Sequence, residues 1–130
     1  MSKTKKITYW VATIWLALGM VSTGIVQLIK MPEEVEAFHQ LGYPEYLLLI
    51  LGTAKLLGVL AILIPKFPVL KEWAYAGFFF MMLGAIASHL ISQDAITDVL
   101  PALLLLVLTA ISWYTRPKNR KLVATNSYLD

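Results

Sequence analysis

The sequence has no cysteine among its 130 residues. This absence excludes disulfides, thiolate metal sites and dithiol redox chemistry, including the quinone-linked disulfide exchange that some small four-helix membrane proteins perform. Charged residues are also scarce, at 15%, whereas 58% of the residues are hydrophobic and the mean hydropathy is +0.70. Such a balance is far from that of soluble domains and indicates an integral membrane protein.

Acidic side chains are missing from three of the four long apolar runs. Each run is near the ~20 residues that one bilayer crossing needs, and we predict transmembrane helices at about residues 8–29, 46–64, 73–91 and 98–114. The predicted fold is therefore an all-α four-helix transmembrane bundle, with residues 1–130 forming a single integral membrane domain. Because no carboxylate lies within the first three of these helices, a proton-coupled exporter is disfavoured.

The segment between the first two predicted helices, residues 30–44, carries the signals of a helix of its own. Pro32, Glu33 and Glu34 suit the first turn of a helix, where proline loses no hydrogen bond and carboxylates complement the helix dipole. Gly42 and Pro44 then end it. We predict a short amphipathic helix that lies at the membrane interface in the first extracytoplasmic loop.

Lysine and arginine cluster in alternate loops, and this pattern predicts the orientation in the membrane. The first loop has Lys30 alone and the third loop has none, whereas the two tails and the second loop are basic. By the positive-inside rule, both termini, including a basic tail at 115–130, should be cytoplasmic. The net charge of +3 then needs no nucleic-acid partner. The basic residues counted are Lys3, Lys5, Lys6, Lys66, Lys71, Arg116, Lys118, Arg120 and Lys121.

Lys55 is a single charge near the middle of the second apolar run. A lysine at the centre of a membrane helix costs roughly 2.5 to 3.5 kcal/mol on insertion scales, so it is rarely present without a reason. With the predicted orientation, Lys55 lies about nine residues, roughly 14 Å, below the outer end of its helix. Its side chain leans toward the N-terminus of that helix, which directs the ammonium to the outer half of the bundle.

Other polar residues are expected at the same depth, because the first and third helices end outside and the fourth begins there. Together with Lys55 they form a predicted polar cluster in the outer half of the bundle, which we interpret as a candidate ligand-binding site. The predicted members are Gln27, His89 and Asp98, with Ser88 and Thr53 nearby.

Three interpretations of Lys55 remain open. It can pair with Asp98 or with backbone carbonyls as a structural lysine, serve as an anion anchor or counter-charge in a small cavity, or extend its ammonium outward along its methylenes. Neither a metal nor a haem is expected, because His39 lies in the loop helix and His89 at a helix end. The chain contains no catalytic motif, so no catalytic residue is assigned and we expect a protein that is not an enzyme.

The third predicted helix carries two further features. Glu72 opens it, where the carboxylate complements the helix dipole and can pair with Lys71 or Lys66 of the preceding loop. Small residues on one face would let another helix approach closely, either inside the bundle or in a homo-oligomer. These small residues are Gly77, Gly84 and Ser88.

Three segments of the sequence resemble the DoxX-like family of small four-helix membrane proteins: FHQLGYP, LGTAKLLGVLAIL and KEWAYAGFFFMMLGAIASH. The resemblance extends over about residues 8–116. It implies a four-helix protein of a kind mostly found in bacterial cytoplasmic membranes. The family takes its name from a membrane subunit of a thiosulfate:quinone oxidoreductase. The matching positions, none with an established catalytic role, are Lys55, Gly58, Glu72, Trp73, Tyr75, Gly77, Gly84 and His89.

Residues and resemblance together leave three functional hypotheses. The first is an accessory or small-ligand-binding membrane protein that uses the polar cluster around Lys55 and needs no cofactor. The second is a membrane subunit of a quinone-linked oxidoreductase, in which Lys55 and His89 hydrogen-bond the oxygens of a quinone. The third, disfavoured above, is a small-molecule exporter. Expected partners are the lipid bilayer, a membrane or redox subunit, and a second copy of the chain.

Overall fold

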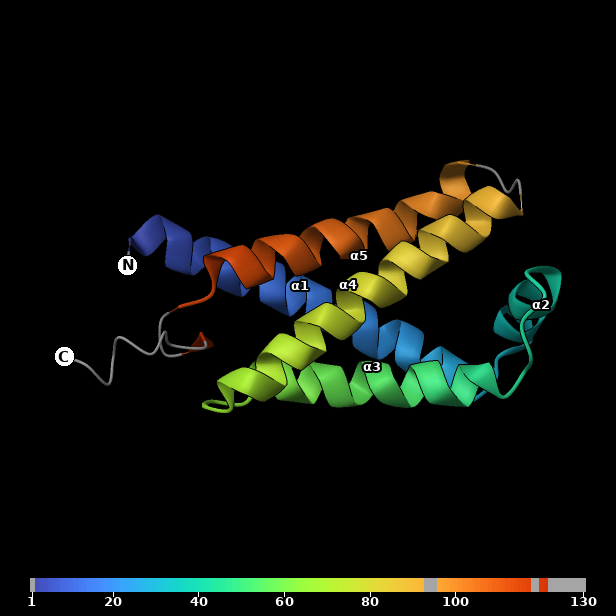
Figure 1. Ribbon diagram of the computed structural model, residues 1–130, viewed down its shortest axis with the longest axis horizontal. Helices are drawn as coiled ribbons and strands as arrows, with labels where there is room; N and C mark the ends of the chain where they lie inside the picture. Colours follow the sequence, from blue (N-terminus) through green and yellow to red (C-terminus); the bar gives the residue numbers. More distant parts are fainter. Residues whose placement is uncertain (1, 93–95, 118–119, 122–130) are drawn as a thin grey trace.

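The computed structural model describes residues 2–92, 96–117, 120 and 121. This part of the chain is helical, and no strand occurs in it. Figure 1 shows the helices α1 (Lys3–Leu28), α2 (Pro32–Gln40), α3 (Leu47–Leu63), α4 (Pro68–Ile91) and α5 (Ile96–Thr115). The all-α class predicted from the apolar runs is confirmed.

The four longer helices form a ring in which each packs against two others. α1 packs against α3 and α5, α4 also packs against α3 and α5, and the short α2 touches α1. The start of α1, the end of α5 and the α3–α4 connection lie at one end of the molecule, on the left of Figure 1. We call this end the terminal end, and the opposite one, which carries α2, the α2 end.

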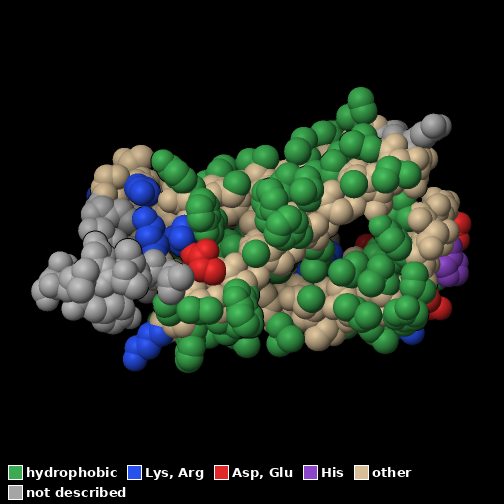
Figure 2. Space-filling model, viewed as in Figure 1, with side chains coloured by type: hydrophobic (Ala, Val, Ile, Leu, Met, Phe, Trp, Pro, Cys, Tyr) green, Lys and Arg blue, Asp and Glu red, His purple; other side chains and the backbone are tan. Residues whose placement is uncertain are grey.

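The outer surfaces of the helices are covered by large apolar side chains. α1, α4 and α5 are each long and apolar enough to cross a membrane, and α3 is a shorter apolar helix of 17 residues. Hydrophobic side chains cover most of the visible face in Figure 2. Leu57, Leu60, Trp73 and Phe80 are each more than half exposed. A soluble protein rarely exposes so large an apolar surface. The chain is a transmembrane protein.

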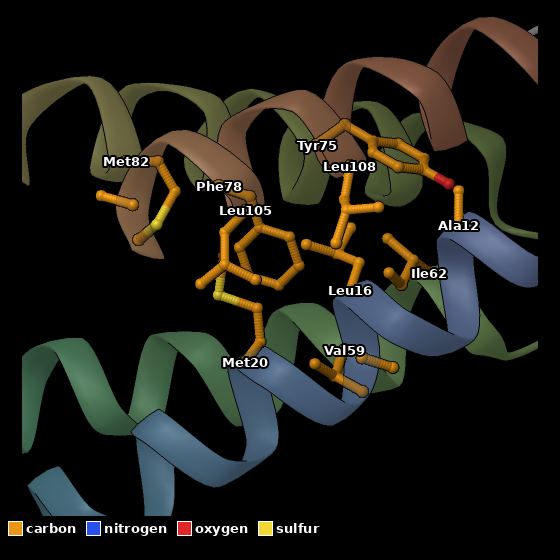
Figure 3. Close-up of a cluster of buried hydrophobic side chains, with 12 residues drawn as sticks. Ala12, Leu16, Met20, Val59, Ile62, Tyr75, Phe78, Met82, Leu105 and Leu108 are labelled. Carbon is orange, nitrogen blue, oxygen red and sulfur yellow. The ribbon is translucent and has the colours of Figure 1, made fainter. Parts of the chain in front are cut away.

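Apolar side chains from all four longer helices fill the centre of the ring. Figure 3 shows Leu16, Ile62, Phe78 and Leu108 pointing toward one another from α1, α3, α4 and α5. Gly58 makes this packing feasible, because a Cβ at that position would lie 2.6 Å from the Phe78 ring. Helices in a membrane associate through such close contacts, because lipid tails are as apolar as the helix surfaces and the hydrophobic effect does little to bring the helices together.

Two helices begin about one turn earlier than the apolar runs predict. α1 begins at Lys3 rather than at 8, because the Ser2 hydroxyl accepts a hydrogen bond from the Lys5 amide at 3.1 Å and caps the helix. α4 begins at Pro68 rather than at 73, after two left-handed residues, Lys66 and Phe67. Proline suits this first helical position. Apolar runs mark the lipid-facing part of a helix and miss the polar turns that precede it.

The earlier start of α4 turns Lys71 into the bundle instead of leaving it in a loop. Lys71 is only 1% exposed, and its ammonium donates hydrogen bonds to the carbonyl of Ala61 at 2.9 Å and to that of Ile64. The Arg120 guanidinium donates to the neighbouring carbonyl of Ile62 at 2.9 Å. These carbonyls end α3 and have no partner within it. Two basic side chains therefore cap this helix.

Glu72 joins α4 to the end of α5. Its carboxylate accepts a hydrogen bond from the Trp113 indole at 2.9 Å and lies 2.7 Å from the Arg116 guanidinium. The predicted pairing with Lys71 or Lys66 is therefore wrong, because Lys71 is already bound to α3. Most of the predicted basic tail at 115–130 lies outside the described residues, as does the 93–95 segment.

A buried set of hydroxyls joins α1, α4 and α5 near the terminal end. The Ser112 hydroxyl lies 2.6 Å from that of Thr13 and 2.8 Å from that of Tyr75. Ser112 and Thr13 are fully buried. Because each hydroxyl both donates and accepts, the three satisfy one another without water. These three hydroxyls are thus paired inside the bundle, whereas the buried hydroxyl of Tyr9 has no hydrogen-bond partner within the described chain.

Candidate functional site

A cavity of about 390 Å³ lies among the helices at the α2 end. All five helices contribute to its wall, and Figure 2 shows the opening between α4 and α3. Most of the wall is apolar, with Phe38, Leu51, Met82 and Leu105 among its residues. Its polar and charged residues are Thr23, Gln27, Glu34, Tyr43, Lys55, Ser88, His89 and Asp98.

Lys55 reaches this cavity from α3 and is 5% exposed. Its ammonium donates a hydrogen bond to the Thr23 hydroxyl at 3.1 Å. That hydroxyl in turn donates to the Gly19 carbonyl at 2.9 Å, which leaves its lone pairs for Lys55. An ammonium has three N–H groups, and among the described residues no second acceptor and no carboxylate pairs with it. Two N–H groups therefore remain for another molecule.

Two glycines hold Lys55 against α1. Gly24 and Gly52 lie where α1 crosses α3, and a Cβ on Gly52 would come within 2.9 Å of the Gly24 carbonyl oxygen. A Cβ on Gly24 would lie 3.3 Å from the Cβ of Lys55. The close crossing brings the Lys55 side chain within reach of Thr23. Small residues at such a crossing are typical of membrane helix pairs.

Gln27 lies one turn beyond Thr23 on the same face of α1. It is 5% exposed and lines the cavity, and its Oε1 atom has no hydrogen-bond partner within the described chain. A buried amide oxygen without a partner costs free energy, about 1 to 3 kcal/mol. The Gln27 oxygen and two N–H groups of Lys55 therefore lie on the same wall of the cavity, and both lack hydrogen-bond partners within the described chain.

The opposite wall is supplied by α4, α5 and the segment before α3. Ser88 and Tyr43 share a hydrogen bond between their hydroxyls, which ties the α2–α3 connection to α4. His89 is half-buried beside Ser88, and Asp98 is exposed in the first turn of α5, at the rim. Hydroxyl, imidazole and carboxylate residues thus line the same cavity as Lys55.

A second carboxylate, Glu34, comes from α2. It is half-buried and lines the cavity, whereas its neighbours Glu33 and Glu36 are exposed and do not. Glu34 forms no ion pair with Lys55, yet it is close enough to interact with the Lys55 ammonium electrostatically. Along α2, Glu34, Ala37 and Phe38 present one face to the cavity. The helix therefore covers one side of the site.

The sequence model of the DoxX-like family matches residues 11–112. The chain belongs to the DoxX-like family. The resemblance seen in the sequence is thereby confirmed, and every residue that lines the cavity of this DoxX-like protein falls inside the matched range. No curated protein and no solved structure matches the chain.

The DoxX-like chain brings the four predicted site residues to one cavity, since Lys55, His89, Gln27 and Asp98 all line it. Lys55 neither pairs with Asp98 nor extends to the surface. Thr53, predicted nearby, is exposed and absent from the wall. It precedes Lys55 by two residues, and at about 100° per residue it points to the other side of α3.

Three polar residues of the wall were not predicted. Helical spacing could have identified Thr23, because it precedes Gln27 by one helical turn and lies on the same face. Glu34 was interpreted only as a helix-start residue, and Tyr43 only as part of the LGYP resemblance. Nothing in the sequence fixes the rotation of α2, so its inward face is known only from the structure.

A second hollow of about 390 Å³ lies between α4 and α5 at the terminal end. Its polar side chains, Glu72, Tyr75, Thr109 and Trp113, all have partners within the protein. Its exposed apolar wall is open to the surrounding lipid. Hydrogen bonding therefore distinguishes the two hollows, and the one around Lys55 is the candidate site.

Proposed function

We propose that this DoxX-like protein is a membrane accessory protein without catalytic activity, which binds a small ligand in the cavity around Lys55. The observation that carries the proposal is the buried Lys55 ammonium, with two N–H groups that no described residue accepts. A ligand with an acceptor atom would accept hydrogen bonds from these N–H groups. The volume of about 390 Å³ is within the range of small-molecule sites.

The comparison with Lys71 argues against a purely structural role for Lys55. A lysine retained for packing is expected to satisfy its ammonium with protein acceptors, as Lys71 does with two carbonyls. Lys55 has one neutral hydroxyl. A charge with so few partners in a membrane helix is costly. The presence of Lys55 therefore favours a role other than stabilising the fold.

The proposal includes four membrane crossings, with both termini in the cytoplasm of the cell. At 17 residues α3 is about 25 Å long, close to the hydrocarbon thickness, and it serves as the fourth crossing. The terminal end carries Lys66, Lys71, Arg116 and Arg120, whereas the α2 end carries the carboxylates of α2. With this orientation, which the positive-inside rule supports, the proposed position of the cavity is the outer half of the membrane.

The test compares Lys55→Met with Thr53→Met, a change on the lipid-facing side of the same helix. Both variants are purified in neutral detergent, and small molecules that co-purify are identified by mass spectrometry. We expect a molecule that is bound to the wild type and to Thr53→Met and is lost from Lys55→Met. An identical set of bound molecules in all three proteins would contradict the proposal.

A quinone is the second candidate ligand. Lys55 from α3 and His89 from α4 line the same cavity, and a quinone presents two carbonyl acceptors. In this case the chain would be the membrane subunit of a quinone-linked oxidoreductase. Redox difference spectra of the purified protein with an added short-chain quinone test it. A spectral change that Lys55→Met removes supports this candidate, and an unchanged spectrum argues against it.

A further inference from the structure

The cavity around Lys55 contains more negative than positive charge. Among the described residues of the wall, Lys55 is the one lysine or arginine, whereas Glu34 and Asp98 are carboxylates, so these residues have one negative charge in excess when His89 is neutral. A simple anion would meet the ammonium but would also be repelled by the two carboxylates. Charge balance therefore disfavours a ligand that is only anionic, although Lys55 alone suggests one.

The charges are also separated along the cavity. Lys55 is buried on α3, next to the crossing with α1, whereas Asp98 is exposed at the start of α5 and Glu34 is half-buried on α2. Lys55 is thus the least accessible of the three charged side chains, and Asp98 is the most accessible. The rest of the wall is largely apolar, with Phe38, Met82 and other such residues.

We propose that the cavity binds a zwitterion with an apolar body, whose anionic group meets Lys55 and whose cationic group faces Glu34 and Asp98. The inference rests on the proposed function, because it names the ligand class of that same site. A zwitterion neutralises both ends of the charge pattern at once. It also leaves none of the three charged side chains with a repulsive neighbour.

Two sources provide this chemistry, a free zwitterionic molecule and the headgroup of a zwitterionic phospholipid. The opening between α3 and α4 connects the cavity with the apolar outer surface of the helices, where lipid lies. Either source can therefore reach Lys55. The experiment needs probes of both kinds.

The test uses three six-carbon probes that differ only in charge: 6-aminohexanoate, hexanoate and hexylamine. Their binding is measured as the increase in the thermal midpoint of the full-length protein in neutral detergent, because a ligand of the folded state stabilises it by mass action. We expect 6-aminohexanoate to bind about tenfold more tightly than hexanoate. Phosphatidylethanolamine, compared with phosphatidylglycerol, probes the lipid source.

Charge removal at the rim separates this inference from the proposed function. In Glu34→Gln with Asp98→Asn, hexanoate should bind at least as tightly as 6-aminohexanoate. The matched control is Glu33→Gln, which removes the same charge from α2 outside the cavity. Lys55→Met should lose hexanoate and 6-aminohexanoate alike.

The possible outcomes differ in what they overturn. If hexanoate binds the wild type best and depends on Lys55, the zwitterion inference is wrong and the proposed function stands. If neither the three probes nor the phospholipids stabilise the protein, the zwitterion inference is wrong, and the co-purification experiment on Lys55→Met decides the proposed function by itself. If only phosphatidylethanolamine stabilises it, the headgroup is the source of the zwitterion.

Discussion

The protein buries two lysines in its membrane helices, and their ammonium groups differ in the number of hydrogen-bond acceptors around them. Lys71, at the terminal end, donates to two backbone carbonyls and completes the end of α3. Lys55, at the α2 end, has one hydroxyl partner and faces a cavity. The exposed fractions of the two side chains are similar, at 1% for Lys71 and 5% for Lys55. What separates a structural lysine from a candidate binding residue is therefore the number of acceptors that the fold supplies.

The largest effect on stability is expected from Lys71→Met. The substitution leaves the last carbonyls of α3 with fewer donors, and each unsatisfied buried acceptor costs about 1 to 3 kcal/mol. We expect a loss of about 3 kcal/mol in the free energy of unfolding, measured by denaturant titration in micelles. Lys66→Met, at an exposed lysine of the same connection, is the control and should change little. Equal stability of the two variants would contradict the capping role.

A smaller loss, about 2 kcal/mol, is expected from Gly52→Ala. The added methyl would lie 2.9 Å from the Gly24 carbonyl and 2.8 Å from Leu28, so α1 and α3 must separate. This separation should also weaken the contact between Lys55 and Thr23. Gly77→Ala is the matched control, because its Cβ would meet nothing within 4 Å and alanine favours a helix. If both alanine variants proved equally stable, the close crossing would not be required.

The smallest effect on stability is expected from Lys55→Met. Methionine fills a similar volume and removes a buried charge that has a single neutral partner, so the free energy of unfolding should stay within about 1 kcal/mol or increase. The same titration as for Lys71→Met measures it. A loss as large as that of Lys71→Met would erase the distinction between the two lysines and would mark Lys55 as structural.

The helices themselves could be predicted, because long apolar runs separated by proline and charge leave few alternatives. The start of α4 could not. The apolar run places the start of this helix at 73, whereas left-handed backbone at Lys66 and Phe67 lets the helix begin at Pro68. Lys71 caps α3 only because of that turn. Arg120 caps α3 because the chain after α5 brings this residue to the end of α3. Neither has a signature in local sequence.

The sequence predicted how deep the candidate-site residues lie in the membrane, but not which side of each helix faces the cavity. Counting residues along each helix places Lys55, Gln27, His89 and Asp98 at one level, and all four line the cavity. Depth does not specify rotation, so Thr53 was placed on the wrong side of α3. It also says nothing about the interior face of a loop helix, which is why Glu34 was missed.

Arg120 has a further consequence for the order of assembly during synthesis. Its guanidinium donates to the carbonyl of Ile62 at the end of α3 and stacks on the Trp10 ring of α1, 4.9 Å from the ring centre. It follows all five described helices in the sequence. This link between α1 and α3 can therefore form only after the ribosome has made α5, so it is a late event in membrane insertion.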